Sequence, residues 1–270
     1  MSAHNGGRAA STMVDSEGHL ERGQGEPVVL IHGLFGQPSN WNGILEALAD
    51  RYWLHAPQLP IAYQPGNQAK DFDAFQVLTE SVVDYMDACG IERATVGGNS
   101  LGGQVAIDLC LRHPERAERL VLAGSAGLFE RDLGSNGMPR VDREWIRAKA
   151  TEVFYEPGHL TEAMVDQLEE MLRDRAYRRF MLRVAKATRA YNVRAELGRL
   201  TLPTLIVWGE ADQITPPEVA EEFAHALSNA RLVFLPNCGH APPIEQPEPF
   251  SRILREFLAE APLGVPARHD

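Results

Sequence analysis

The chain has 270 residues, of which 44% are hydrophobic, and its formal net charge is −11. This length and composition predict one α/β domain with an insertion, and the acidic balance argues against nucleic acid as a partner. No run of about 18 apolar residues occurs, so we expect no membrane span. The N-terminal stretch lacks the apolar core of a secretory signal.

Cysteine and histidine are sparse and unclustered. The three cysteines, Cys89, Cys110 and Cys238, show no C-x-x-C spacing, and the nine histidines form no H-E-x-x-H motif. This pattern argues against a disulfide framework and a zinc site, and it favours a reducing, cytoplasmic compartment. We therefore expect neither a metal nor an organic cofactor.

Short apolar runs alternate with segments of helical period along most of the chain. Strands are predicted at 27–33, 52–59, 92–98, 116–124, 202–209 and 230–236. Helices are predicted at 39–50, 71–90, 101–114, 216–228 and 247–260. Strands that are almost wholly apolar and alternate with helices indicate a mostly parallel sheet with helices on both faces.

One interval breaks this alternation. Between about 127 and 200 the sequence holds three helical patterns, at 142–155, 161–174 and 177–193, and no convincing strand. Residues 130–198 carry 13 Lys and Arg against 12 Asp and Glu, whereas the rest of the chain carries 13 against 25. We therefore predict a helical cap at 127–199, a core at 21–126 and 200–262, and flexible tails at 1–20 and 263–270.

The stretch "VGGNSLGGQVA" at 96–106 places Ser100 among four glycines. It lacks the lysine of a phosphate-binding P-loop and the spacing of a dinucleotide-binding loop. Gly98 to Gly102 does fit G-x-S-x-G between a predicted strand and a predicted helix. Such a turn lifts a serine nucleophile above the sheet, and it requires glycine where the chain passes close to itself. We therefore expect Ser100 to adopt a positive φ.

The stretch "HGLFG" at 32–36 follows the first predicted strand. A serine that attacks a carbonyl creates an oxyanion, which needs two backbone N–H donors. Leu101, directly after the serine, is one candidate, and Leu34 is the other, with Phe35 next. We expect His32 to brace this turn through hydrogen bonds rather than to take part in the chemistry.

An acid and a base follow two later strands. Asp212 lies in "WGEADQITPP", just beyond a predicted strand, with Glu210 as its rival. His240 lies in "PNCGHAPP", just beyond the last predicted strand. Because the carboxyl ends of parallel strands meet at one edge of a sheet, Asp212 and His240 can meet Ser100 there.

The order Ser100, Asp212, His240, each after a strand, resembles that of the α/β-hydrolase superfamily. The resemblance covers roughly residues 20–262. It implies a mostly parallel sheet of about eight strands, a helical cap after the sixth strand, and a site at the carboxyl edge of the sheet beneath the cap.

Within that superfamily, "GNSLGG" resembles the elbow of the meta-cleavage-product hydrolases, which break carbon–carbon bonds. Those enzymes usually carry a more glycine- and proline-rich turn after the first His-Gly and a tryptophan after the catalytic histidine. Here "HGLFGQ" and Ala241 stand at those places. A serine in place of an aspartate nucleophile argues against haloalkane dehalogenases and epoxide hydrolases.

The sequence therefore predicts a serine hydrolase with Ser100 as nucleophile, His240 as base and Asp212 as the acid that orients it. Its expected substrate is a small carboxylic ester. The alternatives are hydrolysis of a C–C bond in a ring-fission product and a non-catalytic ligand receptor, which would bind without turnover. Candidate pocket residues, each also compatible with plain packing, are Phe35, Asn40, Trp41, Phe129 and Trp145. Nothing in the sequence sets the oligomeric state.

Overall fold

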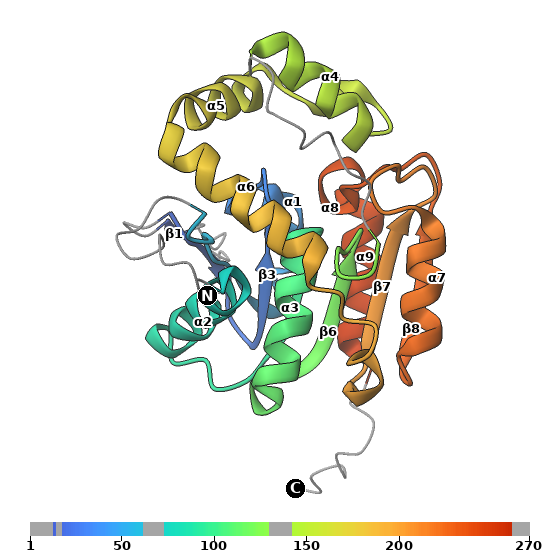
Figure 1. Ribbon diagram of the computed structural model, residues 1–270. Coiled ribbons are helices and arrows are strands. Elements are labelled where there is room, and N and C mark those ends of the chain that lie inside the picture. Colours follow the sequence, from blue (N-terminus) through green and yellow to red (C-terminus); the bar gives the residue numbers. More distant parts are fainter. Residues whose placement is uncertain (1–12, 15–17, 62–72, 130–141, 261–270) are drawn as a thin grey trace, which may run out of the picture.

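An eight-stranded sheet runs through the described part of the chain, with its strands in the order β1-β2-β4-β3-β5-β6-β7-β8 (Figure 1). The computed structural model describes residues 13–14, 18–61, 73–129 and 142–260. The strands are Met13–Val14 (β1), Leu20–Gly23 (β2), Glu26–Ile31 (β3), Tyr52–Ala56 (β4), Ala94–Asn99 (β5), Ala117–Ala123 (β6), Thr204–Gly209 (β7) and Ala230–Leu235 (β8). The β1–β2 and β2–β4 pairs are antiparallel and the other five are parallel, which confirms the predicted fold class.

Helices cover both faces of this sheet. One face carries α2 (Ala74–Ala88), α3 (Leu101–Arg112) and α7 (Pro217–Ala226). The other carries α1 (Asn42–Leu48) and α9 (Pro247–Ala259), the latter preceded by the short α8 (Pro242–Glu245). Short 3-10 turns lie between these elements in the described residues, at Pro38–Trp41, Pro114–Arg116, Pro157–His159 and Leu197–Arg199.

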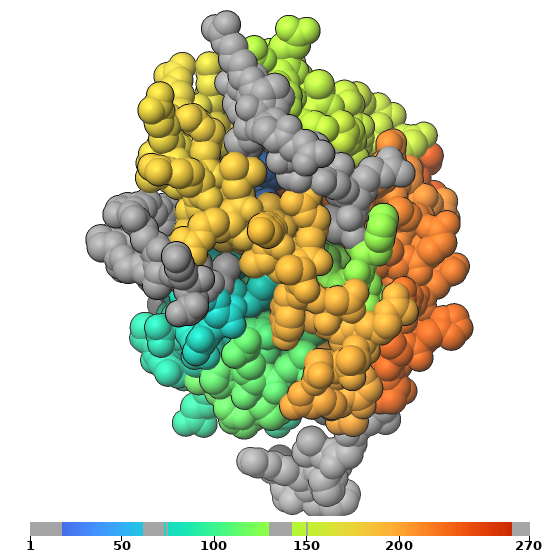
Figure 2. Space-filling model, viewed as in Figure 1, coloured from blue at the N-terminus to red at the C-terminus, as the bar shows by residue number. Residues whose placement is uncertain are grey.

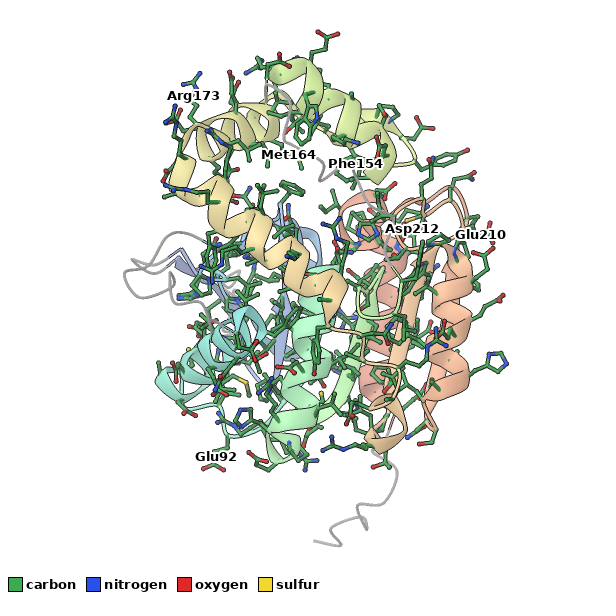
Figure 3. The ribbon with its side chains drawn as sticks, viewed as in Figure 1. Glu92, Phe154, Met164, Arg173, Glu210 and Asp212 are labelled. Atoms are coloured by element: carbon green, nitrogen blue, oxygen red, sulfur yellow. The ribbon has the colours of Figure 1, made fainter. Side chains whose placement is uncertain are left out.

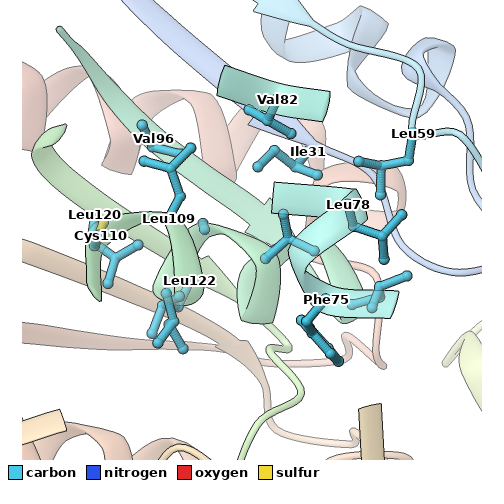
Figure 4. Close-up of a cluster of buried hydrophobic side chains, with 14 of the residues drawn as sticks. Ile31, Leu59, Phe75, Leu78, Val82, Val96, Leu109, Cys110, Leu120 and Leu122 are labelled. Carbon is cyan, nitrogen blue, oxygen red and sulfur yellow. The ribbon is translucent and has the colours of Figure 1, made fainter. Parts of the chain in front are cut away.

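The two-sided cover explains why the strands are apolar at nearly every position. Successive side chains of a strand point to opposite faces. In β3, Val29 and Ile31 therefore join the cluster against α2 and α3 (Figure 4), while Val28 and Leu30 join the cluster against α1 and α9. All four side chains are at most 1% exposed, so neither face of the central sheet meets solvent here.

Trp41 belongs to the second of these clusters. Its side chain is 1% exposed and its ring lies 6.0 Å from that of Phe250 on α9. The packing of α9 against the start of α1 thus places this indole in the core, in agreement with the packing alternative held open for Trp41.

The interval between β6 and β7 forms the predicted helical insertion. Its helices are α4 (Arg143–Val153), α5 (Glu162–Arg173) and α6 (Arg175–Ala190), and the described residues between them contain no strand. Figure 1 shows α4 and α5 beyond the carboxyl ends of β6 and β7, with α6 running back towards α3. Across the described ranges, no helix combines the length and the apolar character that crossing a bilayer requires.

Some strands and helices begin or end at other residues than the sequence predicted. At these places a side-chain hydrogen bond replaces a backbone hydrogen bond of the sheet or helix. The strand predicted to reach residue 59 ends at Ala56, because the N–H of Leu59 donates to His32 Nε2 instead of to a neighbouring strand. Helix α6 starts at Arg175 because the Asp174 side chain caps it, accepting from the Ala176 N–H at 2.7 Å. The predicted tail 1–20 includes β1, and its residues 1–12 and 15–17, like the tail 263–270, lie outside the described residues.

A buried carboxylate joins α3 to the end of α6. Asp108, fully buried on α3, accepts bonds of 2.7 Å from the Thr79 hydroxyl, the Arg112 Nε and the Tyr191 hydroxyl. Gln104, one turn earlier, donates from its amide to the carbonyl of Tyr191. In the space-filling view the atoms of α6 lie against those of α2 and α3, as these bonds require (Figure 2).

Replacing Asp108 by Ala should lower the free energy of unfolding by about 2–4 kcal/mol, because the buried Thr79 hydroxyl, the half-buried Tyr191 hydroxyl and Arg112 lose their acceptor. The measurement is urea denaturation followed by circular dichroism. Asp87→Ala is the matched control: its carboxylate, 64% exposed, pairs with Arg116 at the surface, and its loss should cost at most about 1 kcal/mol. Equal losses for the two variants would contradict the anchoring role of Asp108.

Candidate active site

Ser100 occupies a strained turn between β5 and α3. Its backbone angles are φ 55° and ψ −120°, so the expected positive φ is present. A residue with a Cβ adopts such angles only where the surrounding structure enforces them. The enforcing bonds are visible: the Ser100 N–H donates to the carbonyl of Ala123 at 3.0 Å, and its carbonyl accepts from the N–H of Gly103 at 3.0 Å.

The glycines around Ser100 are required by close approach of the backbone. A Cβ on Gly98 would lie 2.2 Å from the carbonyl carbon of Gly102, and a Cβ on Gly102 would lie 2.1 Å from the carbonyl oxygen of Ile31. A Cβ on Gly103 would meet the Ser125 hydroxyl at 2.4 Å. Both flanking glycines of the G-x-S-x-G motif therefore allow β3, β5 and α3 to converge beneath the serine.

His240 and Asp212 form a buried pair. Nδ1 of His240 lies 2.9 Å from Oδ2 of Asp212, and their side chains are 7% and 0% exposed. Because an ionised carboxylate only accepts hydrogen bonds, the imidazole carries its proton on Nδ1, which leaves Nε2 as the basic nitrogen. Glu210 is exposed, so Asp212 is the carboxylate that contacts the imidazole; Figure 3 marks both.

Thr215 is hydrogen-bonded to the Asp212–His240 pair. The sequence alone does not identify this residue. Its hydroxyl donates to Asp212 Oδ2 at 2.9 Å and lies 3.2 Å from His240 Nδ1. The backbone N–H groups of Ile214 and Thr215 donate to the other oxygen of Asp212, at 2.8 and 3.0 Å. The only sequence signal was the Asp-x-x-Thr spacing, which is typical of a turn closed by an aspartate.

The serine turn and the histidine loop are bonded to each other. Asn99, just before Ser100, donates from its amide to the carbonyls of Ala123 and His240, both at 2.9 Å. Gly124 lies between them at φ 50°, and a Cβ there would stand 2.6 Å from the His240 carbonyl oxygen. The ends of β5 and β6 and the loop after β8 thus meet at one point of the carboxyl edge.

His32 braces the turn after β3, as expected. Its Nδ1 lies 2.8 Å from the Gly33 carbonyl and its Nε2 accepts from the Leu59 N–H at 3.1 Å, so Nδ1 carries the proton and donates to Gly33. Burial lowers the pKa of His32 from 6.5 to about 4. The ring is therefore neutral near pH 7 and holds the turn through these two hydrogen bonds.

The two candidate oxyanion donors belong to the first residue of α3 and to the turn after β3. Leu101 is the first residue of α3, where helix geometry leaves the backbone N–H without an intrahelical acceptor. Leu34 follows Gly33 in the braced turn, and a Cβ on Gly33 would be 3.4 Å from the Cβ of Ser100. The turn therefore runs directly beside the serine.

The remaining candidate pocket residues occupy varied positions. Phe35 and Phe129 are 39% and 55% exposed, and Trp145 is partly buried against the main core cluster. The Asn40 side-chain oxygen accepts from the Gln37 N–H at 2.8 Å and so closes its own turn. A cavity of about 400 Å³ is lined by other residues: His19, Gly36, Gln58, Leu59, Pro60, Ile61, Met171 and Tyr177.

The residue after His240 packs against the insertion. Ala241 is 2% exposed and forms a small cluster with Phe154, which follows α4. Figure 3 shows Phe154 and Met164 on the inner side of the insertion. Ala241 and Phe154 therefore join the histidine loop to the insertion.

Metal ligation finds no support in this geometry. Over residues 13–14, 18–61, 73–129 and 142–260, no group of three or more His, Cys, Asp or Glu side chains could hold a metal ion. Ser100 follows β5, Asp212 follows β7 and His240 follows β8, so all three lie at the carboxyl edge of the parallel sheet.

Fold and site together define an α/β hydrolase. Residues 28–253 match the model of the alpha/beta hydrolase family, and the chain belongs to that family. It is similar to a structurally solved alpha/beta hydrolase enzyme from the metagenome of lagoon sediments at Mar Chica, Morocco, with 29% identity and a TM-score of 0.72. That match covers 92% of this chain and 97% of the other.

Two curated relatives differ in the bond they cleave. The chain is 32% identical over 258 residues to a pimeloyl-(acyl-carrier protein) methyl ester esterase of Nitrosomonas europaea, covering 86% of this chain and 96% of that protein. It is 28% identical over 265 residues to a 2-hydroxy-6-oxo-6-phenylhexa-2,4-dienoate hydrolase of Burkholderia cepacia, covering 89% and 91%. The family thus includes both esterases and C–C hydrolases.

The lowered pKa of His32 predicts a pH-dependent stability. The folded chain keeps this ring neutral, whereas the unfolded chain takes up a proton as the pH falls below 6.5. Stability should therefore be full above that pH and should fall towards pH 4, with His32 contributing a loss of about 1–2 kcal/mol by about pH 5. Urea titrations at several pH values measure the slope.

His32→Asn should flatten that slope, even though it lowers the stability at neutral pH. His225→Asn is the control, because this side chain is exposed in the folded protein and its replacement should leave the slope as it is. A slope that is identical in the wild type and the His32 variant would show that His32 is not held neutral by burial.

Proposed function

We propose that the protein is a serine hydrolase that cleaves a small carboxylic ester through an acyl-enzyme intermediate. The observation that carries this proposal is the buried contact of 2.9 Å between His240 Nδ1 and Asp212 Oδ2, bonded through Asn99 to the strained turn of Ser100. A tautomer fixed in this way gives a neutral imidazole whose Nε2 can act as the general base.

In the proposed reaction, Ser100 Oγ attacks the acyl carbon while His240 Nε2 takes the hydroxyl proton. The oxyanion that forms is stabilised by the backbone N–H groups of Leu34 and Leu101 and by the positive end of α3. The intermediate collapses, the C–O bond to the alcohol breaks, and His240 returns the proton to the departing oxygen. Water then attacks the acyl-enzyme by the same route, which restores Ser100 and releases the acid.

The helical segment 127–199 acts in this proposal as a cap over the site. Phe154 on its inner side packs on Ala241 beside the base, and Met171 and Tyr177 from α5 and α6 line the cavity of about 400 Å³ together with Gly36 of the oxyanion turn. A volume of this size suits a small ligand. We propose that the acyl chain of the ester extends from Ser100 past Gly36 into this cavity.

An ester is favoured over a C–C bond by two observations. The esterase relative is 32% identical and the dienoate hydrolase relative 28%. In addition, Ala241 stands where meta-cleavage-product hydrolases usually carry a tryptophan, and Phe154 fills the adjoining space. C–C hydrolysis of a ring-fission product is the second candidate, because the elbow "GNSLGG" resembles theirs.

Replacing Ser100 by Ala should abolish the burst of product from p-nitrophenyl esters of graded chain length. Turnover should fall to a residual ~10³–10⁴-fold over water, because the oxyanion donors remain. Stopped-flow absorbance measures both. Ser81→Ala, which removes a partly buried serine on α2, is the control and should keep the burst.

A chromogenic ring-fission dienoate separates the two enzymatic readings. The wild type should hydrolyse esters and leave the dienoate unchanged. If it ignores every ester but consumes the dienoate, and Ser100→Ala stalls at a ketonised intermediate, the protein is a C–C hydrolase. Binding of these compounds without turnover of any would identify a ligand receptor instead.

Thr215→Val should lower kcat for the ester by about 10-fold, the equivalent of one hydrogen bond of about 1.4 kcal/mol to the Asp212–His240 pair. The shape of the side chain is kept, so KM should change little. Steady-state kinetics measure this split. Thr188→Val removes another buried hydroxyl, which bonds the Val184 carbonyl on α6, and should leave kcat unchanged; a similar loss in both variants would assign the effect to general packing.

A further inference from the structure

Glu245 is a buried carboxylate that the proposed reaction does not use. It ends the short helix α8 and is 7% exposed. Its Oε2 accepts from the backbone N–H groups of Tyr155 and Gly239, at 2.8 and 2.9 Å, and its Oε1 accepts from the N–H of Ala241 at 3.0 Å. A carboxylate is buried at such a place only where donors replace its hydration.

The three donors have a common position: they surround His240. Gly239 and Ala241 are its two neighbours in the chain, and Tyr155 follows α4 in the cap. The N–H of His240 itself donates to the carbonyl of Val153, the last residue of α4, at 2.7 Å. The backbone on both sides of the imidazole is thus tied to Glu245 and to the end of α4.

The loop that carries His240 and the end of α4 are in close backbone contact. A Cβ on Gly239 would lie 2.5 Å from the carbonyl oxygen of Val153 and 2.8 Å from the amide nitrogen of Tyr155. Among the described residues Glu245 has no salt-bridge partner, and its carboxylate accepts from three backbone amides. Such charge-assisted bonds are stronger than those between neutral groups.

We propose that Glu245 is a positioning residue for His240, and that it couples the end of α4 in the cap to the base. Its carboxylate accepts from both chain neighbours of His240 and also from Tyr155. A displacement of α4 therefore displaces the imidazole relative to Ser100. The inference rests on the proposed function, in which His240 is the general base. It assigns to the cap a second role besides enclosing the substrate.

The chemistry of the side chain supplies the test. A glutamine at 245 keeps the shape but offers one acceptor oxygen and an NH₂ group, which cannot accept from an N–H and so opposes one of the donors. Glu245→Gln should lower kcat for the ester by about 10- to 100-fold, since small displacements of a catalytic group have effects of this size, with KM within about twofold.

Two further readouts distinguish positioning from mere support of the fold. The labelling rate of Ser100 by a fluorophosphonate, which also needs the base, should fall in parallel with kcat. The acid limb of the pH profile of kcat/KM should move to lower pH, because a loosened contact with Asp212 stabilises the imidazolium less. Glu248→Gln, an exposed carboxylate three residues further on, is the matched control and should alter none of these.

Amide hydrogen exchange gives a measurement that needs no substrate. The amides of Tyr155, Gly239 and Ala241 should exchange faster in Glu245→Gln than in the wild type and in Glu248→Gln. If the wild type cleaves no ester, the proposed function fails, and this measurement still decides whether Glu245 holds the loop and α4 together.

A folded Glu245→Gln variant with the wild-type kcat, labelling rate and amide exchange rates would overturn the inference. A variant that loses stability but keeps the wild-type kcat would overturn it as well. If that variant does not fold, Glu245→Asp takes its place, since it keeps the charge and shortens the reach by one methylene. It should show the same fall in kcat with KM preserved, and wild-type kcat in Glu245→Asp would equally refute the role of Glu245.

Discussion

The convergence of β3, β5 and α3 beneath Ser100 is the constraint on which the rest of the site depends. It leaves no room for a Cβ at Gly98 or Gly102, and it holds Ser100 itself at positive φ. A sheet buried on both faces provides the rigidity that keeps such a turn strained. Once the turn is fixed, Asn99 bonds to the His240 carbonyl and Gly33 runs beside Ser100, so the histidine loop and the turn after β3 are placed by the same few contacts.

The cap joins this site at both of its ends. The end of α4 meets the histidine loop through Val153 and Tyr155, while the segment after α6 meets α3, the helix that begins at the serine, through Tyr191. The insertion is therefore not a separate lobe resting on the sheet. Each of its ends is hydrogen-bonded to an element that carries one of the proposed catalytic groups, which gives a physical route from contacts in the cap to the geometry of the site.

The chain also illustrates how one family supports different chemistries. Relatives at similar identity include a methyl ester esterase and a dienoate hydrolase, so the sheet, the elbow and the acid–base pair do not distinguish the two. Ala241 and Phe154, which pack together from the histidine loop and the insertion, are among the side chains that we propose to set this choice.

The sequence by itself determined the features that are encoded locally. Apolar runs predicted the strands, the helical period predicted α4 to α6, and G-x-S-x-G predicted a positive φ at Ser100, because each depends on residues adjacent in the chain. Only the tertiary structure decided that Thr215 contacts His240, 25 residues later, that Glu245 reaches Tyr155, 90 residues earlier, and that Trp41 packs in the core on Phe250. A threonine, a glutamate and a tryptophan are each compatible with several surroundings. Their partners are chosen by the packing of distant elements, which a local pattern does not contain.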